Sequence, residues 1–273
     1  MNLCDVITVS TNFLREKALK YHNNVFLIKN ALSNDFFKKS TTNFELRSKK
    51  KQKHIVLSYL SGSNSHDSDF AQIEDVLVTI LETYKFLKLL IVGPLNYKKQ
   101  LFEKFNSRFE HKSKVLYDDY HLIFQKIDVN LVPLELSDFN HAKSELKYIE
   151  AGASGIPSVL SPSITHKEVI VNGKNGFLCY NKKDWIDTLA LLITNSELRE
   201  KIGVAARNHV CDEYTAEARS KDLSLFFDCI NKKFEEKKSI SNPSNFFLIL
   251  GLSIKLHIYR FIWKLRNLKR VIT

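Results

Sequence analysis

The chain is 273 residues long, with 44% apolar and 26% charged residues, which is enough for one large or two medium domains of an ordinary globular protein. Its net charge is +11, but ten Lys or Arg and two Glu lie between Asn231 and Thr273, so +8 of that excess belongs to the tail. Because the rest of the chain is close to neutral and shows no nucleic-acid-binding motif, a basic nucleic-acid-binding protein is disfavoured.

Two kinds of segment alternate along the chain. Short apolar runs rich in β-branched residues predict strands at 6–10, 25–29, 55–60, 87–92, 114–117, 129–132, 158–160 and 176–179. Segments with apolar residues at spacings of three and four predict helices at 69–84, 97–105, 120–127, 144–154, 183–193, 197–214 and 216–236. This alternation predicts an α/β fold, a Rossmann-like doubly wound parallel sheet with helices on both faces.

The composition changes at two places. The stretch 38–53 is polar, strongly basic and without periodicity, so we interpret it as a surface linker. Pro243 follows the last helix of the alternating pattern and begins a separate tail. We therefore expect a Rossmann-like domain at 54–238 and an independent tail at 243–273.

The segment 128–161 reads as a buried strand, a polar loop, a helix and a second buried strand. In a doubly wound sheet, ligands bind beyond the carboxyl ends of the strands, where loops meet helix N-termini. Ser144 is a candidate N-cap, and the N–H groups of the following turn favour a diphosphate, with Lys143 and Lys147 adding positive charge. Glu150 lies further along the helix, where its carboxylate would accept hydrogen bonds from a ribose diol.

Several motifs occur in a fixed order around this segment. They are SYLSGSNSHDSDF (58–70), LLIVGPL (89–95), FNHAKSELKYIEA (139–151), VNGKNGFLCYNKKDW (171–185) and ELREKIGVAARNHV (197–210). Together they resemble the carboxyl-terminal donor domain of GT-B-fold glycosyltransferases, close to glycosyltransferase family 4. The first strands, in DVITVSTNFL and VFLIKNAL, are similar to the end of that family's amino-terminal domain, so 1–37 is expected to be a remnant of it with the crossover.

The resemblance implies a role for individual residues. Glu150 corresponds to the glutamate that binds the ribose hydroxyls, and Ser144 with Glu145 would meet the diphosphate and the donor sugar. Gly62 and Ser63 would lie in the glycine loop near the phosphates, with His66 at the start of the next helix. Loop hydrogen bonding or capping is an equally good explanation of His66. The base is expected near Asp118, at the end of the strand 114–117.

Two departures from the family pattern affect the catalytic assignment. The family places a second glutamate eight positions before Glu150, where this chain has Ala142. Glu145 or His141 could cover that role, and Glu145 with Lys143 are the expected catalytic residues. A complete GT-B enzyme also has an amino-terminal acceptor domain of which this chain contains only the end.

The tail has the pattern of an interfacial amphipathic helix. From 246 to 270, apolar and aromatic residues recur at helical spacing, and Lys and Arg lie on or beside the opposite face. We expect this helix to bind an anionic membrane surface on the cytoplasmic side. The alternative is a terminal helix packed on the protein itself or on a further domain. No segment supplies about 20 apolar residues without charge, so a spanning helix is not expected.

The leading interpretation is the donor half of a glycosyltransferase that transfers a sugar from a nucleoside-diphosphate sugar to a polysaccharide or lipid-linked acceptor. The family resemblance implies that the sugar's configuration is retained. The alternative is a truncated or orphan domain that binds the donor without transferring it, or one that works with a separate acceptor-domain subunit. No cofactor or metal is expected, since the four cysteines are scattered and form no CxxC pair. A nicotinamide dehydrogenase is disfavoured because no GxGxxG motif opens the first helix.

Overall fold

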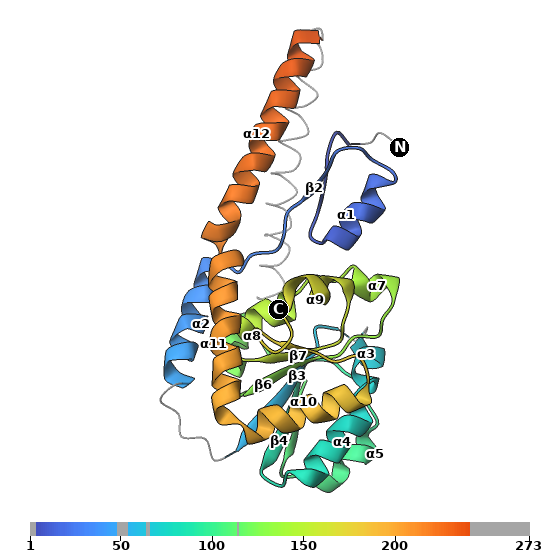
Figure 1. Cartoon of the computed structure of the whole chain (residues 1–273), viewed down its shortest axis with the longest axis vertical. Coiled ribbons are helices and arrows are strands. Elements are labelled where there is room, and N and C mark those ends of the chain that lie inside the picture. Colours follow the sequence, from blue (N-terminus) through green and yellow to red (C-terminus); the bar gives the residue numbers. More distant parts are fainter. Residues whose placement is uncertain (1–3, 48–53, 64–65, 114, 241–273) are drawn as a thin grey trace, which may run out of the picture. The chain divides into compact units, whose positions relative to one another are not determined.

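The computed structural model describes residues 4–240 apart from 48–53, 64–65 and 114 (Figure 1). Its contacts divide the chain after Asp222 into two units, and the described part of the second unit belongs to α12 (Ala216–Ile240). The first unit holds all the residues predicted to form the site. The predicted amphipathic tail at 243–273 lies outside the described residues.

The first unit is built around a six-stranded parallel sheet. Its strands are β3 (Ile55–Leu60), β4 (Leu87–Val92), β5 (Phe109–Lys112), β6 (Val129–Val132), β7 (Ser158–Leu160) and β8 (Phe177–Leu178). In space they follow the order β5-β4-β3-β6-β7-β8, so the chain starts in the middle, builds one half outward and then returns to build the other. This is the strand order of a doubly wound Rossmann-like sheet, and it confirms the predicted α/β fold.

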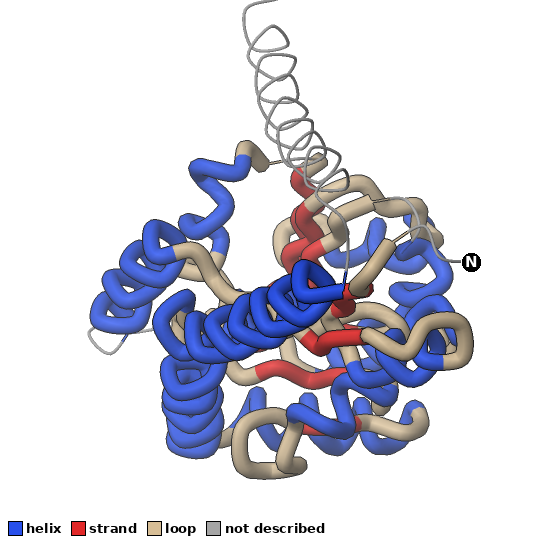
Figure 2. Tube along the Cα trace, turned by 90° about the horizontal axis from the view of Figure 1, so that it is seen from above, coloured by secondary structure: helices blue, strands red, loops and turns tan. Residues whose placement is uncertain are grey.

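Helices cover both faces of this sheet (Figure 2). One apolar layer holds α3 (Asp67–Ala71), α4 (Glu74–Thr83) and α10 (Lys182–Thr194); the other holds α2 (Asn34–Arg47), α6 (Tyr117–Ile123), α8 (Leu146–Ala153) and α11 (Ser196–Glu213). Strand β3 serves both layers, because Leu57 and Tyr59 pack into the first and Leu60 into the second. The near-continuous apolar strands are explained by this two-sided burial.

Three short helices and a separate strand pair complete the unit. The helices are α5 (Lys99–Phe102), which runs into a 3-10 turn at Glu103–Phe105, α7 (Asp138–His141) and α9 (Ile164–Val169). The pair consists of β1 (Ile7–Val9) and β2 (Val25–Leu27), which are parallel and joined by α1 (Asn12–Leu19). Thr11 caps α1 by accepting a hydrogen bond from the N–H of Leu14.

Four of the central strands have the predicted bounds, but the prediction of a linker at 38–53 is wrong as far as residue 47, because α2 extends to Arg47. The buried face of α2 contains Phe36, Ser40 and Asn43. Two of these three inward positions are polar, so the helix shows no apolar periodicity. The amide of Asn43 is satisfied instead by hydrogen bonds to the carbonyl of His121 and from Gln125.

The predicted strand at 114–117 is also wrong. The strand at this edge of the sheet is β5, whose sequence FEHK is mostly polar, and α6 already begins at Tyr117. β5 is at the edge of the sheet and is less buried than the central strands, so its sequence does not contain the run of apolar residues by which the central strands were predicted. The predicted helix at 69–84 is two helices, α3 and α4, and the predicted helix at 144–154 begins at Leu146.

Candidate functional site

The site is located by the strand order. The direction of the sheet's construction reverses between β3 and β6, which pair in parallel, so the loops that follow these two strands leave the same edge side by side. Ligands of doubly wound proteins bind at this point. The loop after β3 leads through His66 into α3, and the loop after β6 leads through Lys143 into α8.

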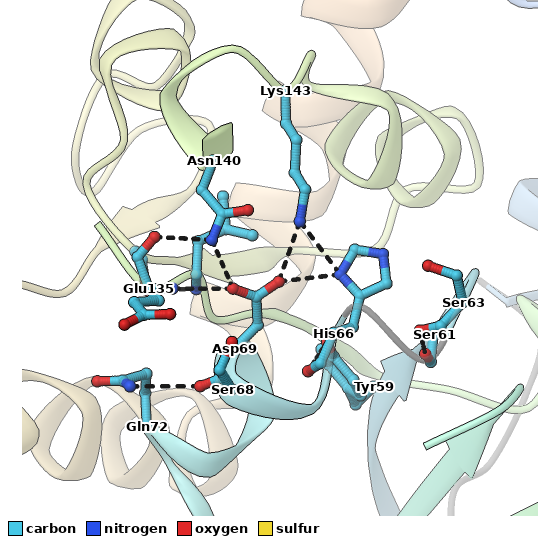
Figure 3. Close-up of polar contacts among 12 residues, drawn as sticks. Tyr59, Ser61, Ser63, His66, Ser68, Asp69, Gln72, Glu135, Asn140 and Lys143 are labelled. Carbon is cyan, nitrogen blue, oxygen red and sulfur yellow. Dashed lines mark hydrogen bonds and ion pairs between the residues drawn. The ribbon is translucent and has the colours of Figure 1, made fainter. Parts of the chain in front are cut away.

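A carboxylate joins the two loops (Figure 3). Asp69 of α3 has no exposed surface, and its Oδ1 accepts hydrogen bonds from the N–H of Glu135 (2.9 Å) and Nδ2 of Asn140 (2.7 Å). Its Oδ2 lies 2.9 Å from Nδ1 of His66 and 3.1 Å from Nζ of Lys143. Burial alone would raise the pKa of Asp69, but the hydrogen bonds from His66, Glu135 and Lys143 outweigh it and lower the pKa to about 2. Asp69 is therefore a permanent anion around which the two loops are arranged.

His66 and Lys143, both predicted site residues, are brought together by this anion. His66 directly precedes α3 and makes no side-chain cap for it, so the capping explanation of this histidine is not needed. Nζ of Lys143 lies 3.3 Å from Nδ1 of His66 and 5.0 Å from the centre of the Phe139 ring. The positive charge of Lys143 is thus already engaged by Asp69.

The ammonium of Lys147 is contacted by an aromatic ring but by no hydrogen-bond acceptor among the described residues. Lys147 lies in the first turn of α8, with its buried Nζ 4.6 Å from the centre of the Tyr59 ring. Its pKa is lowered to about 8, mainly by desolvation on burial; the nearby Lys143 acts in the same direction, whereas Asp69 and Glu150 act against it. A buried ammonium without a partner is costly, so this atom is poised to receive an anion.

Glu150 lies one turn after Lys147 on the same helix and is half-buried. Burial raises its pKa to about 7, although a 3.0 Å hydrogen bond from the Tyr120 hydroxyl and the charge of Lys147 both lower it. Tyr120 belongs to α6. The sequence connected Asp118 of this helix with the site, but not Tyr120.

Two predicted residues lie differently from the expectation. Ser144 does not cap α8; its Oγ accepts a 2.8 Å hydrogen bond from Nδ2 of Asn30 in the crossover after β2. Glu145 occupies the N-cap position without a side-chain cap hydrogen bond and is 2% exposed. Its carboxylate faces the hydroxyl of the buried Tyr214, so it lies in the interior under the loop.

The remaining predicted residues lie at the surface of the loops. Gly62 and Ser63 are exposed after β3, and the carbonyl of Ser63 accepts a 3.0 Å hydrogen bond from Oγ of Ser61. Asp118 is exposed in the first turn of α6, not at a strand end. None of the contacts that the structure describes joins Asp118 to the Asp69 cluster.

The sequence reasoning missed Asp69, Asn140 and Tyr120 as site residues. Asp69 and Asn140 lie within the motifs 58–70 and 139–151. The polar residues of these two motifs, each in a loop that follows a predicted strand, were the only sequence feature that could have indicated the two side chains. In the part of the chain that the structure describes, no group of three or more His, Cys, Asp or Glu is arranged to hold a metal ion. Within the same residues, no helix is both long and apolar enough to cross a membrane.

Comparisons with known proteins give one family. The sequence model of the family described as glycosyl transferase-like matches residues 74–224. A comparison with the curated proteins gave no match.

Solved structures share the fold. HepE of Anabaena, in complex with UDP and glucose, superposes with a TM-score of 0.64 at 12% identity, covering 82% of this chain and 63% of that one. WaaG, a glycosyltransferase involved in lipopolysaccharide biosynthesis, gives a TM-score of 0.61 at 16% identity, with 80% and 61% covered. The C-terminal domain of the group 1 glycosyl transferase LpcC from Francisella tularensis gives 0.50 at 17% identity, with 64% and 92% covered. The chain thus spans less than two thirds of HepE and WaaG but nearly all of the isolated LpcC domain.

Proposed function

This chain belongs to the glycosyl transferase-like family, and we propose that it binds a nucleoside-diphosphate sugar at the junction of β3 and β6 for transfer to a glycan or lipid-linked acceptor. The observation that carries the proposal is the ammonium of Lys147, buried and without a hydrogen-bond partner among the described residues. Beside it lie the first N–H groups of α8, which have no partner within their own helix. An ammonium and a helix N-terminus together form a receptor for a diphosphate.

The ribose is assigned to Glu150. Glu150 follows Lys147 by three residues on α8, about 4.5 Å along the helix axis, so a ribose attached to a diphosphate at Lys147 would lie beside it. As a carboxylate it accepts hydrogen bonds from both hydroxyls of the diol, and Tyr120 holds its Oε2 in place. The complex of HepE with UDP supports a uridine nucleotide as the first donor to test.

The transfer step would rest on stabilising the leaving diphosphate. As the bond between the sugar and the diphosphate breaks, negative charge grows on the phosphate oxygens, where Lys147 and the N-terminus of α8 are placed to offset it. The catalytic role predicted for Lys143 would use the ammonium hydrogens that Asp69 does not accept. For Glu145 we propose a structural role in place of a catalytic one, because its side chain is 2% exposed and contacts Tyr214 in the interior. Retention of the sugar's configuration stays a prediction from the family resemblance.

The acceptor and the cellular setting are inferred from the family. A cell-surface glycan is the proposed acceptor, in keeping with the role of WaaG in lipopolysaccharide biosynthesis. Binding of segment 246–270 to the inner face of the cytoplasmic membrane stays a prediction from the sequence. A separate acceptor-domain subunit likewise stays a prediction from the sequence.

Calorimetric titration tests donor binding. We expect UDP to bind the wild type and Lys147→Met to weaken it about tenfold or more, as for the loss of a charge-assisted hydrogen bond. Lys201→Met, on the exposed side of α11, is the matched control and should bind as the wild type does. GDP is titrated in parallel to identify the base. Equal UDP affinity in Lys147→Met and wild type would contradict the phosphate assignment.

A second measurement separates the two candidate functions. A transferase releases UDP from UDP-sugar when a suitable acceptor glycan is added, whereas a donor-binding domain binds UDP-sugar and releases none. Binding without turnover across a panel of lipid-linked and free glycans would favour the binding domain.

A further inference from the structure

The two oxygens of Asp69 have different partners. Oδ1 is taken by the N–H of Glu135 and the amide of Asn140, both from the loop after β6. Oδ2 is shared by His66 and Lys143 (Figure 3). The first pair fixes the carboxylate to the fold, and the second pair consists of the two site residues that the carboxylate can orient.

The contact with Oδ2 decides which nitrogen of His66 carries the proton. A carboxylate oxygen accepts hydrogen bonds and donates none, so Nδ1 at 2.9 Å from Oδ2 must be protonated. Lys143 then directs its own hydrogen to Oδ2 rather than to Nδ1. In the neutral ring this leaves the lone pair on Nε2, which Figure 3 shows on the side of the ring away from Asp69.

The order of groups along the site indicates what meets Nε2. Under the proposed function, Glu150 holds the ribose and Lys147 the diphosphate. Nζ of Lys147 lies 4.6 Å from the centre of the Tyr59 ring, and the Tyr59 hydroxyl donates a 3.4 Å hydrogen bond to the carbonyl of His66, so Tyr59 links the diphosphate position to His66. A nucleoside-diphosphate sugar has its ribose, diphosphate and sugar in that sequence. The group beyond the diphosphate, toward Lys143 and His66, is therefore the sugar.

We propose that Asp69 is a positioning residue that fixes His66 as its Nδ1–H tautomer, so that Nε2 accepts a hydrogen bond from a hydroxyl of the donor sugar. The proposal rests on the proposed function and adds to it a contact that distinguishes a sugar nucleotide from the bare nucleotide. His66 is the contact residue, and Asp69 acts through it.

Asp69→Asn tests the positioning role with little change of shape. Its Oδ1 would still accept from Glu135 and Asn140, which places Nδ2 where Oδ2 was. This amide donates to Nδ1 of His66, so the proton of the ring moves to Nε2, by the same logic that an Asp-to-Asn change reverses the tautomer in a Ser-His-Asp triad. Asp67→Asn is the matched control, because Asp67 lies on the same helix but hydrogen-bonds only Asn96 among the described contacts.

The tautomer is read directly by nitrogen NMR of the full-length chain labelled with ¹⁵N, with His66→Ala identifying the signal among the nine histidines. We expect protonated Nδ1 in the wild type and in Asp67→Asn, and protonated Nε2 in Asp69→Asn. An unchanged tautomer in Asp69→Asn would overturn the positioning role. Thermal melts of the three variants establish that each is folded.

The sugar contact is read by comparing UDP with UDP-sugars. One neutral hydrogen bond predicts a preference of about 2- to 10-fold for the matching UDP-sugar over UDP in the wild type. That preference should disappear in His66→Ala and persist in Asp67→Asn. It should weaken in Asp69→Asn, where the sugar hydroxyl has to accept from Nε2–H instead of donating to Nε2. If Asp69 acted only as a negative charge, both Asp variants would bind UDP more tightly and keep the preference, which would contradict the proposal.

Failure of the proposed function can be distinguished from failure of the His66 contact. A wild type that binds neither UDP nor GDP would remove the donor site and the sugar contact with it, while the tautomer would still report on Asp69. A bound complex in which His66 carries protons on both nitrogens would leave the donor site standing and overturn the hydroxyl contact, since an imidazolium cannot accept.

Discussion

The hydroxyl of Tyr120 donates a 3.0 Å hydrogen bond to Oε2 of Glu150, linking α6 to the ribose position on α8. Burial raises the pKa of Glu150 to about 7, and this hydrogen bond holds it from rising further. If the carboxylate form binds the ribose, UDP affinity falls as the pH drops below 7. Tyr120→Phe should move the midpoint of that fall to higher pH.

Calorimetry between pH 5.5 and 8.5 checks this dependence. Because the diphosphate itself gains a proton near pH 6, Glu150→Gln serves as the control: it should bind weakly and retain only the part of the pH dependence that belongs to the nucleotide. A midpoint that does not move in Tyr120→Phe would separate Tyr120 from the binding role of Glu150.

The raised pKa of Glu150 also predicts how the free energy of unfolding depends on pH. A carboxyl whose pKa is higher in the folded protein than in the unfolded one favours the folded state at low pH and ceases to do so as the pH rises from about 4.5 to 7. A shift of this size corresponds to at most about 3 kcal/mol, so Glu150→Gln should be more stable than the wild type by about 1–3 kcal/mol at pH 7.5. Urea unfolding at pH 7.5 and pH 4.5 measures the difference, which should vanish at the lower pH.

The sequence predicted the fold well, because the fold depends on strong local signals. The apolar runs of β3, β4, β6 and β7 gave correct bounds, and the polar loops after β3 and β6 do meet. The individual roles depend on directions that no local pattern encodes. Glu145 and Glu150 are alike in sequence, yet one faces the interior and the other Tyr120. The engagement of Lys143 by Asp69, 74 residues away, is likewise a property of the sheet order.

The packing of α2, most of which the sequence analysis interpreted as a linker, can be tested at Arg47. Arg47 hydrogen-bonds the carbonyl of Ile127 and lies 3.7 Å from the carboxylate of Asp128, which is 1% exposed and also accepts from the N–H of Val56. Arg47→Met leaves this buried charge with one cation fewer, so we expect a loss of about 3 kcal/mol in urea unfolding. Lys38→Met, exposed on the same helix, should change stability by less than about 0.5 kcal/mol. If Arg47→Met lost as little stability as Lys38→Met, the packing of α2 would not depend on the contact between Arg47 and Asp128.

Gly93 permits the close approach between the ends of β3 and β4. Its φ is +99°, and a Cβ atom there would lie 1.9 Å from the carbonyl oxygen of Ser61. Gly93→Ala must therefore strain the backbone and push away the loop that carries Gly62, with an expected loss of at least about 2 kcal/mol in thermal or urea unfolding. Gly62→Ala is the matched control, since its Cβ would meet no atom within 4 Å. Equal stability of the two variants would show that the turn relaxes without cost.

The buried ammonium of Lys147 should lower the free energy of unfolding at neutral pH, although the same ammonium is proposed to bind the diphosphate. Its pKa is lowered to about 8 by burial, so the folded state holds the charged form less well than the unfolded state does, and stability increases as the pH rises from about 8 to 10.5. At pH 7 the cost is at most about 3 kcal/mol, and Lys147→Met should unfold at higher temperature than the wild type. Adding UDP should raise the unfolding temperature of the wild type by more than that of Lys147→Met at the same UDP concentration, because the stabilisation by a ligand increases with its affinity. A Lys147→Met variant that is less stable than the wild type at pH 7 would instead mark this ammonium as a structural contact, satisfied in the absence of any ligand.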